Sequence, residues 1–294
     1  MRVVVVGGCG YIGSALCPVL RNHGHDVHVV DLGLRGMPEM AGSSVTIEDY
    51  VTAPVKSFDS FDAIVLLAGH SSVGIAADDP VGALLNNIVG LQRMLDIADG
   101  RALIYASSGS VYDGLGSHPG SEDSLLAQPR NIYDLTKRVG DELASMNGTN
   151  WSALRFGTVN GPSANLRLDL MINRMTADAI KKGQVTVANP HAHRAILSID
   201  DLTGLVAEML TNSWKSCGVL NVSSFNASIG EIATQVGEIM AVPVVEAASS
   251  STYDFTMSVA KAHLLYGFEP HDDLGVLIDK LAAFYTGSGR HFLD

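Results

Sequence analysis

The fold of this chain is decided near its beginning, by the stretch Val3-Val4-Val5-Val6-Gly7-Gly8-Cys9-Gly10-Tyr11-Ile12-Gly13. The four valines predict a buried strand, because a strand covered on both faces reads as a continuous apolar run. The three-residue spacing of the later glycines permits a tight turn into a helix and a close approach of the backbone to a ligand. A pyrophosphate placed there would meet the positive end of the helix. The stretch therefore predicts a strand, a turn and a helix that bind a dinucleotide.

An acidic residue strengthens this interpretation. Asp31 follows the second predicted strand, where a carboxylate can accept hydrogen bonds from an adenosine ribose and repel a 2'-phosphate. A solvated turn is the alternative role for Asp31, and Arg35 nearby could instead accommodate a 2'-phosphate. We expect NAD, with NADP as the alternative.

Short apolar runs alternate with longer helical patterns in the first half of the chain, which indicates βαβ units around a parallel sheet. An apolar spacing of three to four residues predicts helices over 81–98 and 132–146. The apolar runs predict six strands, at 2–6, 26–30, 44–47, 63–68, 102–106 and 152–156.

The pattern changes after about residue 157, to scattered helices and two brief strands at 185–188 and 219–222. We expect a dinucleotide-binding domain over 1–157, to which later segments could return. We expect residues 158–294 to form mainly a smaller substrate-binding lobe. A cleft between the lobes is the expected ligand site, as in other open α/β sheets.

Composition narrows the class of protein. A formal charge of −12 disfavours nucleic acid as a partner, and no apolar run approaches the roughly 20 residues that cross a bilayer. The apolar run after Met1-Arg2 breaks at glycines, so we do not expect a secretory signal. The three cysteines, Cys9, Cys17 and Cys217, show neither disulfide nor metal-site spacing, which favours structural thiols in a cytoplasmic protein.

Tyr133 and Lys137 stand four residues apart in a predicted helix, so both project from one face. An ammonium beside a tyrosine favours the phenolate, which would let Tyr133 act as a general acid or base. Such a pair is also common in ordinary helices. The serine-rich run 105–112, which leaves the fifth predicted strand at its carboxyl end, supports the catalytic interpretation because Ser108 could bridge Tyr133 to a substrate hydroxyl.

Together, the glycine loop, Asp31, the serine-rich strand end and the Tyr133–Lys137 pair resemble the extended short-chain dehydrogenase/reductase family, and most of all its NAD-dependent nucleotide-sugar epimerase and dehydratase branch. The resemblance runs from Met1 to about Pro162 and continues less specifically to about Pro270. It implies an α/β fold, a Rossmann-type doubly wound parallel sheet with a smaller C-terminal α/β substrate lobe.

The resemblance also implies roles for individual residues. Catalysis would fall to Tyr133, Lys137 and Ser108, and substrate contacts to Ser108, Thr158 and Arg194. An ion pair with Asp200 or Asp201 is the alternative role for Arg194, and an ordinary polar helix position is the alternative for Asn87. The implied cofactor contacts are Gly7, Gly10, Tyr11, Ile12, Gly13, Asp31, Asp49, Tyr50, Leu67, Ala68, Gly69, Asn87, Tyr133 and Lys137.

The chain departs from the family pattern in two places. Many related dehydratases carry an Asp-Glu pair where this chain has Gly109 and Ser110, so dehydration is disfavoured. Residues 249–253 lack the second diphosphate-binding arginine of many relatives, and Arg167 or Arg174 could replace it or simply lie on a solvated helix face. We expect no metal at His191-Ala192-His193, because no nearby ligand completes a shell.

Three functions follow from these observations. The first is an NAD-dependent epimerase that acts on a nucleotide-sugar through a transient keto intermediate, with Tyr133 as acid and base. The second is an NAD-dependent dehydrogenase or reductase for another secondary alcohol or ketone, and the third is a non-catalytic NAD-sensing protein. The helices predicted over 81–98 and 132–146 resemble those that pair across the dimer interface of the family, so we expect a homodimer.

Overall fold

The computed structural model describes residues 1–38, 42–115, 118–147, 150–212, 214–249 and 251–287. The chain forms two compact units, and each is assembled from three segments. Unit 1 comprises Met1–Val111, Gln128–Arg155 and Thr203–Leu220. Unit 2 comprises Tyr112–Ala127, Phe156–Leu202 and Asn221–Asp294.

A seven-stranded sheet forms the centre of unit 1, in the order β10-β6-β5-β4-β1-β2-β3. In β1, Val3 pairs in parallel with Val27 on one side and with Ala63 on the other. This largely parallel sheet confirms the predicted α/β fold. The strands are β1 (Arg2–Val6), β2 (Asp26–Asp31), β3 (Ser44–Ile47), β4 (Ala63–Leu66), β5 (Ala102–Ser108), β6 (Trp151–Phe156) and β10 (Gly218–Val222).

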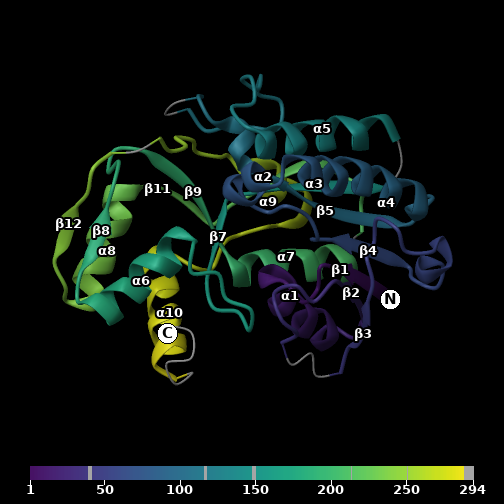
Figure 1. Ribbon diagram of the computed structural model, residues 1–294, viewed down its shortest axis with the longest axis horizontal. Coiled ribbons are helices and arrows are strands. Elements are labelled where there is room, and N and C mark those ends of the chain that lie inside the picture. The colour runs from purple at the N-terminus through teal and green to yellow at the C-terminus, as the bar shows by residue number, and fades with distance from the viewer. Residues whose placement is uncertain (39–41, 116–117, 148–149, 213, 250, 288–294) are drawn as a thin grey trace. The chain divides into compact units, whose positions relative to one another are not determined.

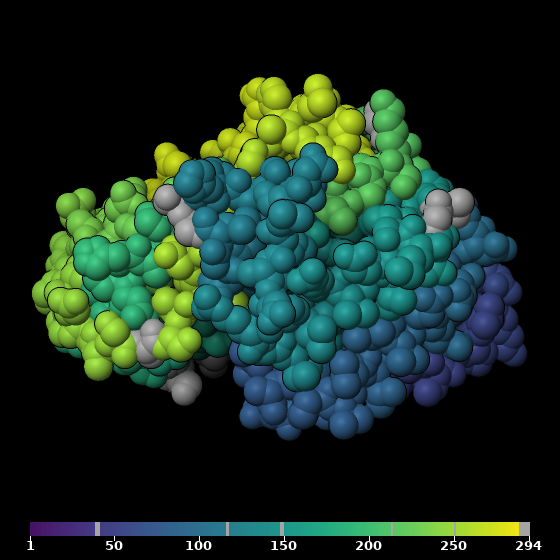
Figure 2. All heavy atoms as spheres, turned by 90° about the horizontal axis from the view of Figure 1, so that it is seen from above, coloured from purple at the N-terminus to yellow at the C-terminus, as the bar shows by residue number. Residues whose placement is uncertain are grey.

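Helices cover both faces of this sheet, as Figure 1 shows. One layer holds α2 (Val73–Asp78), α3 (Pro80–Leu84), α4 (Leu91–Ala98) and α5 (Ile132–Asn147), and the other holds α1 (Tyr11–Asn22) and α7 (Ile199–Thr211). Figure 2 views the first layer from outside, with the teal atoms of α5 beside the blue atoms of its neighbours. Within the described ranges, no helix combines the length and the apolar character that crossing a bilayer requires.

The helix predicted over 81–98 is interrupted by a π-helical turn, η2 (Leu85–Gly90), between α3 and α4. Tyr50 donates a hydrogen bond of 2.7 Å from its hydroxyl to the carbonyl of Asn86 in this turn. A Cβ at Gly90 would lie 2.6 Å from the same hydroxyl, so glycine lets the Tyr50 ring approach the turn. Apolar periodicity does not reveal such a turn, because it depends on a side chain from elsewhere in the sequence.

The strand predicted over 219–222 belongs to the main sheet, where β10 lies beside β6. The sequence places it after the change in pattern that separates the two predicted lobes. Leu220 and Val222 are fully buried, which is the burial expected in a sheet covered on both faces. A short apolar strand does not by itself specify which sheet it joins, so only the tertiary structure assigns it.

Unit 2 is a smaller α/β assembly. Its strands are β7 (Thr158–Asn160), β9 (His193–Ser198) and β11 (Phe225–Ser228) in one sheet, and β8 (Val185–Val187) and β12 (Val244–Glu246) in another. Its helices are α6 (Met171–Lys182), α8 (Ile229–Met240), α9 (Ala260–Tyr266) and α10 (Leu274–Gly287). A capping box formed by Ser228 and Glu231 starts α8. The apolar core includes Ile172, Ile232 and Leu277.

The glycine loop between β1 and α1 is packed too closely for side chains. Gly7 has a φ of +87°, and a Cβ there would lie 2.5 Å from the backbone nitrogen of Ala68. A Cβ at Gly13 would lie 2.5 Å from both the carbonyl oxygen of Gly7 and the Cα of Gly8. Because the obstructing atoms are backbone, they cannot move aside as a flexible side chain can.

We predict that Gly13→Ala lowers the free energy of unfolding by about 1–3 kcal/mol, because the added methyl group overpacks the loop. The variant should also bind NAD more weakly, as calorimetry would show. Gly204→Ala in α7 is the matched control, since no atom lies within 4 Å of its added Cβ, and it should be neutral or stabilising by up to about 1 kcal/mol. Equal urea midpoints for the two variants would contradict the overpacking argument.

Candidate active site

The glycine loop presents backbone groups at the carboxyl end of β1. Gly10 is the N-cap residue of α1, and no side chain caps this helix among the described residues. The amides of its first turn therefore lie where an anion could accept their hydrogen bonds. Without side chains at Gly7 and Gly13, the backbone of the loop packs closely on itself and on the residues after β4. The backbone amides of the loop then fit the pyrophosphate of a dinucleotide.

Asp31 ties the end of β2 to this loop. Its Oδ2 accepts a hydrogen bond of 2.9 Å from the amide of Cys9, and its Oδ1 accepts one of 2.8 Å from the amide of Gly33. These two bonds fix the carboxylate beside the loop, where the sequence predicts a contact with the adenosine ribose. Carboxylate oxygens have further lone pairs, so ribose hydroxyls could still donate to them.

Asp49 and Tyr50 follow β3, and the structure shows how both are held. Oδ1 of Asp49 accepts a hydrogen bond of 2.9 Å from the amide of Val51. Tyr50 is only 5% exposed, and its hydroxyl is occupied by the carbonyl of Asn86. Burial, with a smaller contribution from Asp49, raises the pKa of Tyr50, so this hydroxyl stays protonated and continues to donate. The adenine contacts of the two residues remain predictions.

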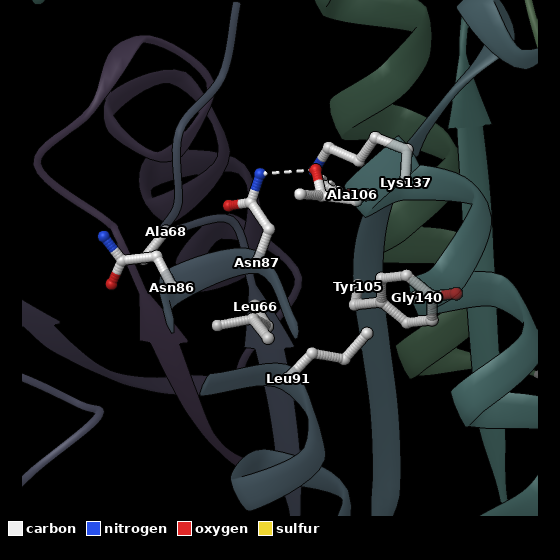
Figure 3. Close-up of a pocket in the computed structure, with 10 residues that line it drawn as sticks. Leu66, Ala68, Asn86, Asn87, Leu91, Tyr105, Ala106, Lys137 and Gly140 are labelled. Atoms are coloured by element: carbon white, nitrogen blue, oxygen red, sulfur yellow. Dashed lines mark hydrogen bonds between the residues drawn. The ribbon is translucent and has the colours of Figure 1, made fainter. Parts of the chain in front are cut away.

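Asn87 joins the end of β4 to α5 (Figure 3). Its Oδ1 accepts a hydrogen bond of 2.9 Å from the amide of His70, and its Nδ2 donates bonds of 3.0 Å to the carbonyl of His70 and to Oγ1 of Thr136. Thr136 in turn donates a bond of 2.8 Å to the carbonyl of Tyr133. Asn87 is 8% exposed, so it is not one of the solvated polar positions of its helix.

His70 is a residue of this region that the sequence reasoning missed. It directly follows Gly69 after β4, and a titratable residue at the carboxyl end of a parallel strand was the available signal. Its Nε2 lies 3.2 Å from Oδ2 of Asp79, and its Nδ1 lies 3.2 Å from Nδ2 of Asn86. In the tautomer with its proton on Nε2, the imidazole donates to Asp79 and accepts from Asn86.

Tyr133 and Lys137 lie on one face of α5, as predicted. Nζ of Lys137 lies 5.7 Å from the centroid of the Tyr133 ring and donates a hydrogen bond of 2.8 Å to the carbonyl of Ala106. Burial lowers the pKa of Lys137 to about 8, while the charge of Asp141 acts in the opposite direction. The pocket in Figure 3 is lined by Leu66, Ala68, Asn86, Asn87, Leu91, Tyr105, Ala106, Thr136, Lys137 and Gly140.

Ser108 begins a chain of buried hydrogen bonds at the end of β5. Its hydroxyl donates to Oγ of Ser110 at 3.0 Å, and Ser110 donates to Oδ1 of Asp134 at 2.7 Å. Nδ2 of Asn131 donates a hydrogen bond of 2.7 Å to the other carboxylate oxygen of Asp134. The sequence reasoning missed Ser110 and Asp134 as partners. The position of Asp134, next to Tyr133, was a signal for a carboxylate near the site.

The predicted substrate residues Thr158 and Arg194 lie in unit 2, where β7 pairs with β9. Arg194 is 8% exposed; its guanidinium donates to the carbonyl of His193 at 2.9 Å and to Oγ1 of Thr252. Burial lowers the pKa of Arg194, while Asp113 and Asp254 oppose this effect. Thr252 thus contacts Arg194 from the segment in which relatives carry a second arginine.

The acidic residues proposed as alternative partners of Arg194 bind other groups. Asp200 pairs with Lys280 at 2.5 Å, and Asp201 accepts a hydrogen bond of 2.6 Å from Ser224. Arg167 pairs with Asp169, and Arg174 pairs with Asp178. His193 contacts Asp254 at 3.3 Å, and the described part of the chain holds no cluster of three potential metal ligands.

Comparisons with known proteins agree with this geometry. Residues 3–223 match the model of the NAD dependent epimerase/dehydratase family. UDP-glucuronic acid decarboxylase 1 of Xenopus tropicalis is 27% identical over 99% of this chain and 73% of its own length. UDP-glucuronate 4-epimerase 3 of Arabidopsis thaliana is 24% identical over 97% of this chain and 76% of its own length. The solved structure of MoeE5 with UDP-glucuronic acid and NAD is 25% identical, with a TM-score of 0.86 over 98% of this chain and 100% of MoeE5.

We predict that Lys137→Met stabilises the ligand-free protein at pH 7, by about 1–3 kcal/mol, because it removes a desolvated charge. The pKa of Lys137 is about 8 in the folded protein against an ordinary value of 10.5. At pH values between these two pKa values, Lys137 is protonated in the unfolded chain but not in the folded protein. The stability of the unmodified protein therefore rises with pH in this range. Lys137→Met should lack this rise.

Urea unfolding between about pH 7 and about pH 10 would measure both effects. Lys56→Met, at an exposed position, is the control and should leave the pH dependence unchanged. A parallel pH dependence for Lys137→Met and the unmodified protein would show that Lys137 is not a desolvated charge.

Proposed function

This chain belongs to the NAD-dependent epimerase/dehydratase family and is an enzyme that uses NAD, and we propose that it epimerises a nucleotide-sugar through a transient keto intermediate. The observation that carries the proposal is the arrangement of Tyr133 and Lys137 on α5, fastened through Thr136 and Asn87 to the end of β4. The named relatives that act on UDP-sugars support the substrate class.

The residues that would hold NAD are those predicted for it from the sequence. The amides of the glycine loop would bind the pyrophosphate, Asp31 the adenosine ribose and Lys137 the nicotinamide ribose. When bound, NAD supplies the group that accepts a hydride from the sugar carbon and returns it. The site must therefore keep the ketone in place while the sugar presents its other face.

Tyr133 is the proposed acid and base. The Lys137 ammonium near its ring favours the phenolate, which removes the proton of the sugar hydroxyl during oxidation. The same oxygen returns the proton when the ketone is reduced, so the two half-reactions balance. Ser108 would bind the sugar hydroxyl. Because the single proton of the sugar hydroxyl goes to Tyr133, Ser108 would bind the sugar oxygen as a donor, by turning its own hydroxyl proton from Ser110 to the substrate, while the amide of Ser110 continues to donate to Ser108.

The proposed substrate is a UDP-linked hexuronate or hexose. MoeE5 was solved with UDP-glucuronic acid, and both named curated relatives carry UDP-glucuronate in their names. Arg194 and Thr158 are the proposed substrate contacts, with Arg194 directed at the diphosphate because a guanidinium binds such oxygens in pairs. A net dehydrogenase or reductase is the competing activity, because it would need the same Tyr133–Lys137 pair.

The cysteines support a cytoplasmic location, which we propose for this enzyme. Cys9, Cys17 and Cys217 are reduced cysteines, and Cys9 and Cys17 are buried. Burial, with a smaller contribution from Asp31, raises the pKa of Cys9 to about 11, and burial raises that of Cys17 to about 12. Both stay protonated near neutral pH and suit the structural role predicted for them.

We predict that Tyr133→Phe lowers turnover of UDP-glucuronate or UDP-glucose by about 10²–10⁴-fold, because it removes the acid and base. NAD released from the denatured variant should match that from the unmodified protein, as mass spectrometry would show. Tyr285→Phe is the control, since it removes a hydroxyl that binds the carbonyl of Asn173 in unit 2. It should lower stability more than turnover.

The products discriminate between the candidate reactions. A C4 epimer of unchanged mass, formed without net NADH, supports the epimerase. Net NADH formation would favour a dehydrogenase, and loss of carbon dioxide from UDP-glucuronate would favour a decarboxylase. Full turnover by Tyr133→Phe would contradict the proposed role of Tyr133 in any of these reactions.

We also propose that two copies pair through the helical layer that Figure 2 faces. Val81, Leu85 and Val89 are 50–66% exposed along α3 and η2. An apolar hollow beside them is lined by Val51, Val55, Ile88, Val89, Gln92, Arg93, Asp96, Ile97 and Leu143. A twofold axis would place such a surface against itself and bury it twice, which supports a second copy as the partner.

We predict that Val89→Asp converts the dimer to a monomer, because it would bury an unpaired charge in each half of the interface. Light scattering over a range of concentrations measures the mass. Leu264→Asp on α9 is the control, because Leu264 is 81% exposed outside this surface, and it should stay dimeric. A monomeric unmodified protein at high concentration would refute the dimer.

A further inference from the structure

The ammonium of Lys137 stands in surroundings that do not favour a charge. Its described hydrogen bond goes to the neutral carbonyl of Ala106. The side chains that line the pocket from β4, the loop after it, η2 and α4 are the uncharged Leu66, Ala68, Asn86, Asn87 and Leu91. A desolvated ammonium in such a place tends to lose its proton. The proposed chemistry nevertheless needs the ammonium, since it favours the phenolate of Tyr133.

Asp141 supplies a negative charge one helical turn beyond Lys137. Because the two residues are four apart in α5, they lie on the same face of the helix. Asp141 is 5% exposed, and two donors from the sheet hold its carboxylate. Tyr105 in β5 donates to Oδ1 at 2.7 Å, and Nε of Arg155 in β6 donates to Oδ2 at 2.8 Å.

Stability alone gives a weak account of this buried cluster. Taking a carboxylate and a guanidinium out of water costs about as much as their attraction returns, and apolar replacements are often neutral or stabilising. Tyr105 does, however, link the cluster to the pocket. Its ring lines the pocket (Figure 3), and its hydroxyl donates to Asp141. Asp141 is therefore fixed in surroundings where water screens its charge little, and where Arg155 offsets part of that charge.

We propose that Asp141 is a positioning residue for the reaction, which acts through Lys137 by holding it in the ammonium form. Tyr105 and Arg155 fix the carboxylate, and the carboxylate opposes the loss of the Lys137 proton. The direction agrees with the effect of Asp141 on the pKa of Lys137, which is to raise it against the larger effect of burial. Among the described residues, the charged and titratable groups that act on Lys137 are Tyr133 and Asp141 on its own helix, while Tyr105 on β5 and Arg155 on β6 contact Asp141.

The proposal rests on the catalytic role proposed above for Lys137, but its test does not. The protein, loaded with NAD, is labelled with lysine carrying carbon-13 at Cε, and the signal of Lys137 is followed by NMR through the alkaline pH range. Its identity is established by its loss in Lys137→Arg. We expect Asp141→Asn to lower the pKa of Lys137 by about one unit or more, as the loss of a close opposite charge does.

Tyr105→Phe is the matched control, because it removes a hydrogen bond from the same cluster and leaves the charge of Asp141 in place. It should shift the pKa of Lys137 much less than Asp141→Asn does. An unchanged pKa in Asp141→Asn, or equal shifts in the two variants, would overturn the proposal, since Asp141 would then have only a structural role.

Arg155→Gln keeps the proposal testable if Asp141→Asn does not fold. It removes the counter-charge of Asp141, so the pKa of Lys137 should rise, and a fall would overturn the proposal. Where turnover of a UDP-sugar is measurable, the alkaline limb of kcat should move to lower pH in Asp141→Asn and not in Tyr105→Phe. Absence of turnover in the unmodified protein would count against the proposed function and leave the NMR result standing.

Discussion

The side chain of Asn87 is the connection on which the candidate site depends. Its amide group satisfies both backbone groups of His70 and the hydroxyl of Thr136, so one residue fixes the end of β4 to the helix that carries Tyr133 and Lys137. A buried amide whose oxygen and both N–H groups are bonded has little freedom to move, because each lost bond would leave a desolvated polar group. The π-turn, held by the hydroxyl of Tyr50, is the element that presents Asn87.

A second feature of the site is that two of its carboxylates, Asp134 and Asp141, are buried and each is held by two donors. Lys137 donates a hydrogen bond to a backbone carbonyl. Asp134 accepts hydrogen bonds from Ser110 and Asn131. Asp141 accepts them from Tyr105 and Arg155. Charges in such surroundings act strongly on each other, which suits proton transfer better than stability.

In unit 2, the surroundings of Arg194 hold its guanidinium in place. Thr252 and Tyr253 contact the guanidinium from a segment that contains no arginine. Arg194 is thereby held in one orientation by its own unit. The neighbouring carboxylates of Asp113 and Asp254 oppose the effect of burial on the pKa of Arg194. A guanidinium held in this way could bind a substrate diphosphate, as proposed for Arg194.

The sequence by itself determined what depends on neighbouring residues. The run of valines predicted strand β1, and the glycine spacing predicted the loop between β1 and α1. The interval of four residues from Tyr133 to Lys137 predicted that both lie on one face of a helix. Only the tertiary structure decided that β10 joins the main sheet, that η2 interrupts a regular helix, and that Arg155 reaches Asp141. The physical reason is that local periodicity records which face of an element is buried, while the partners of a buried polar group come from distant parts of the chain and leave no periodic signal.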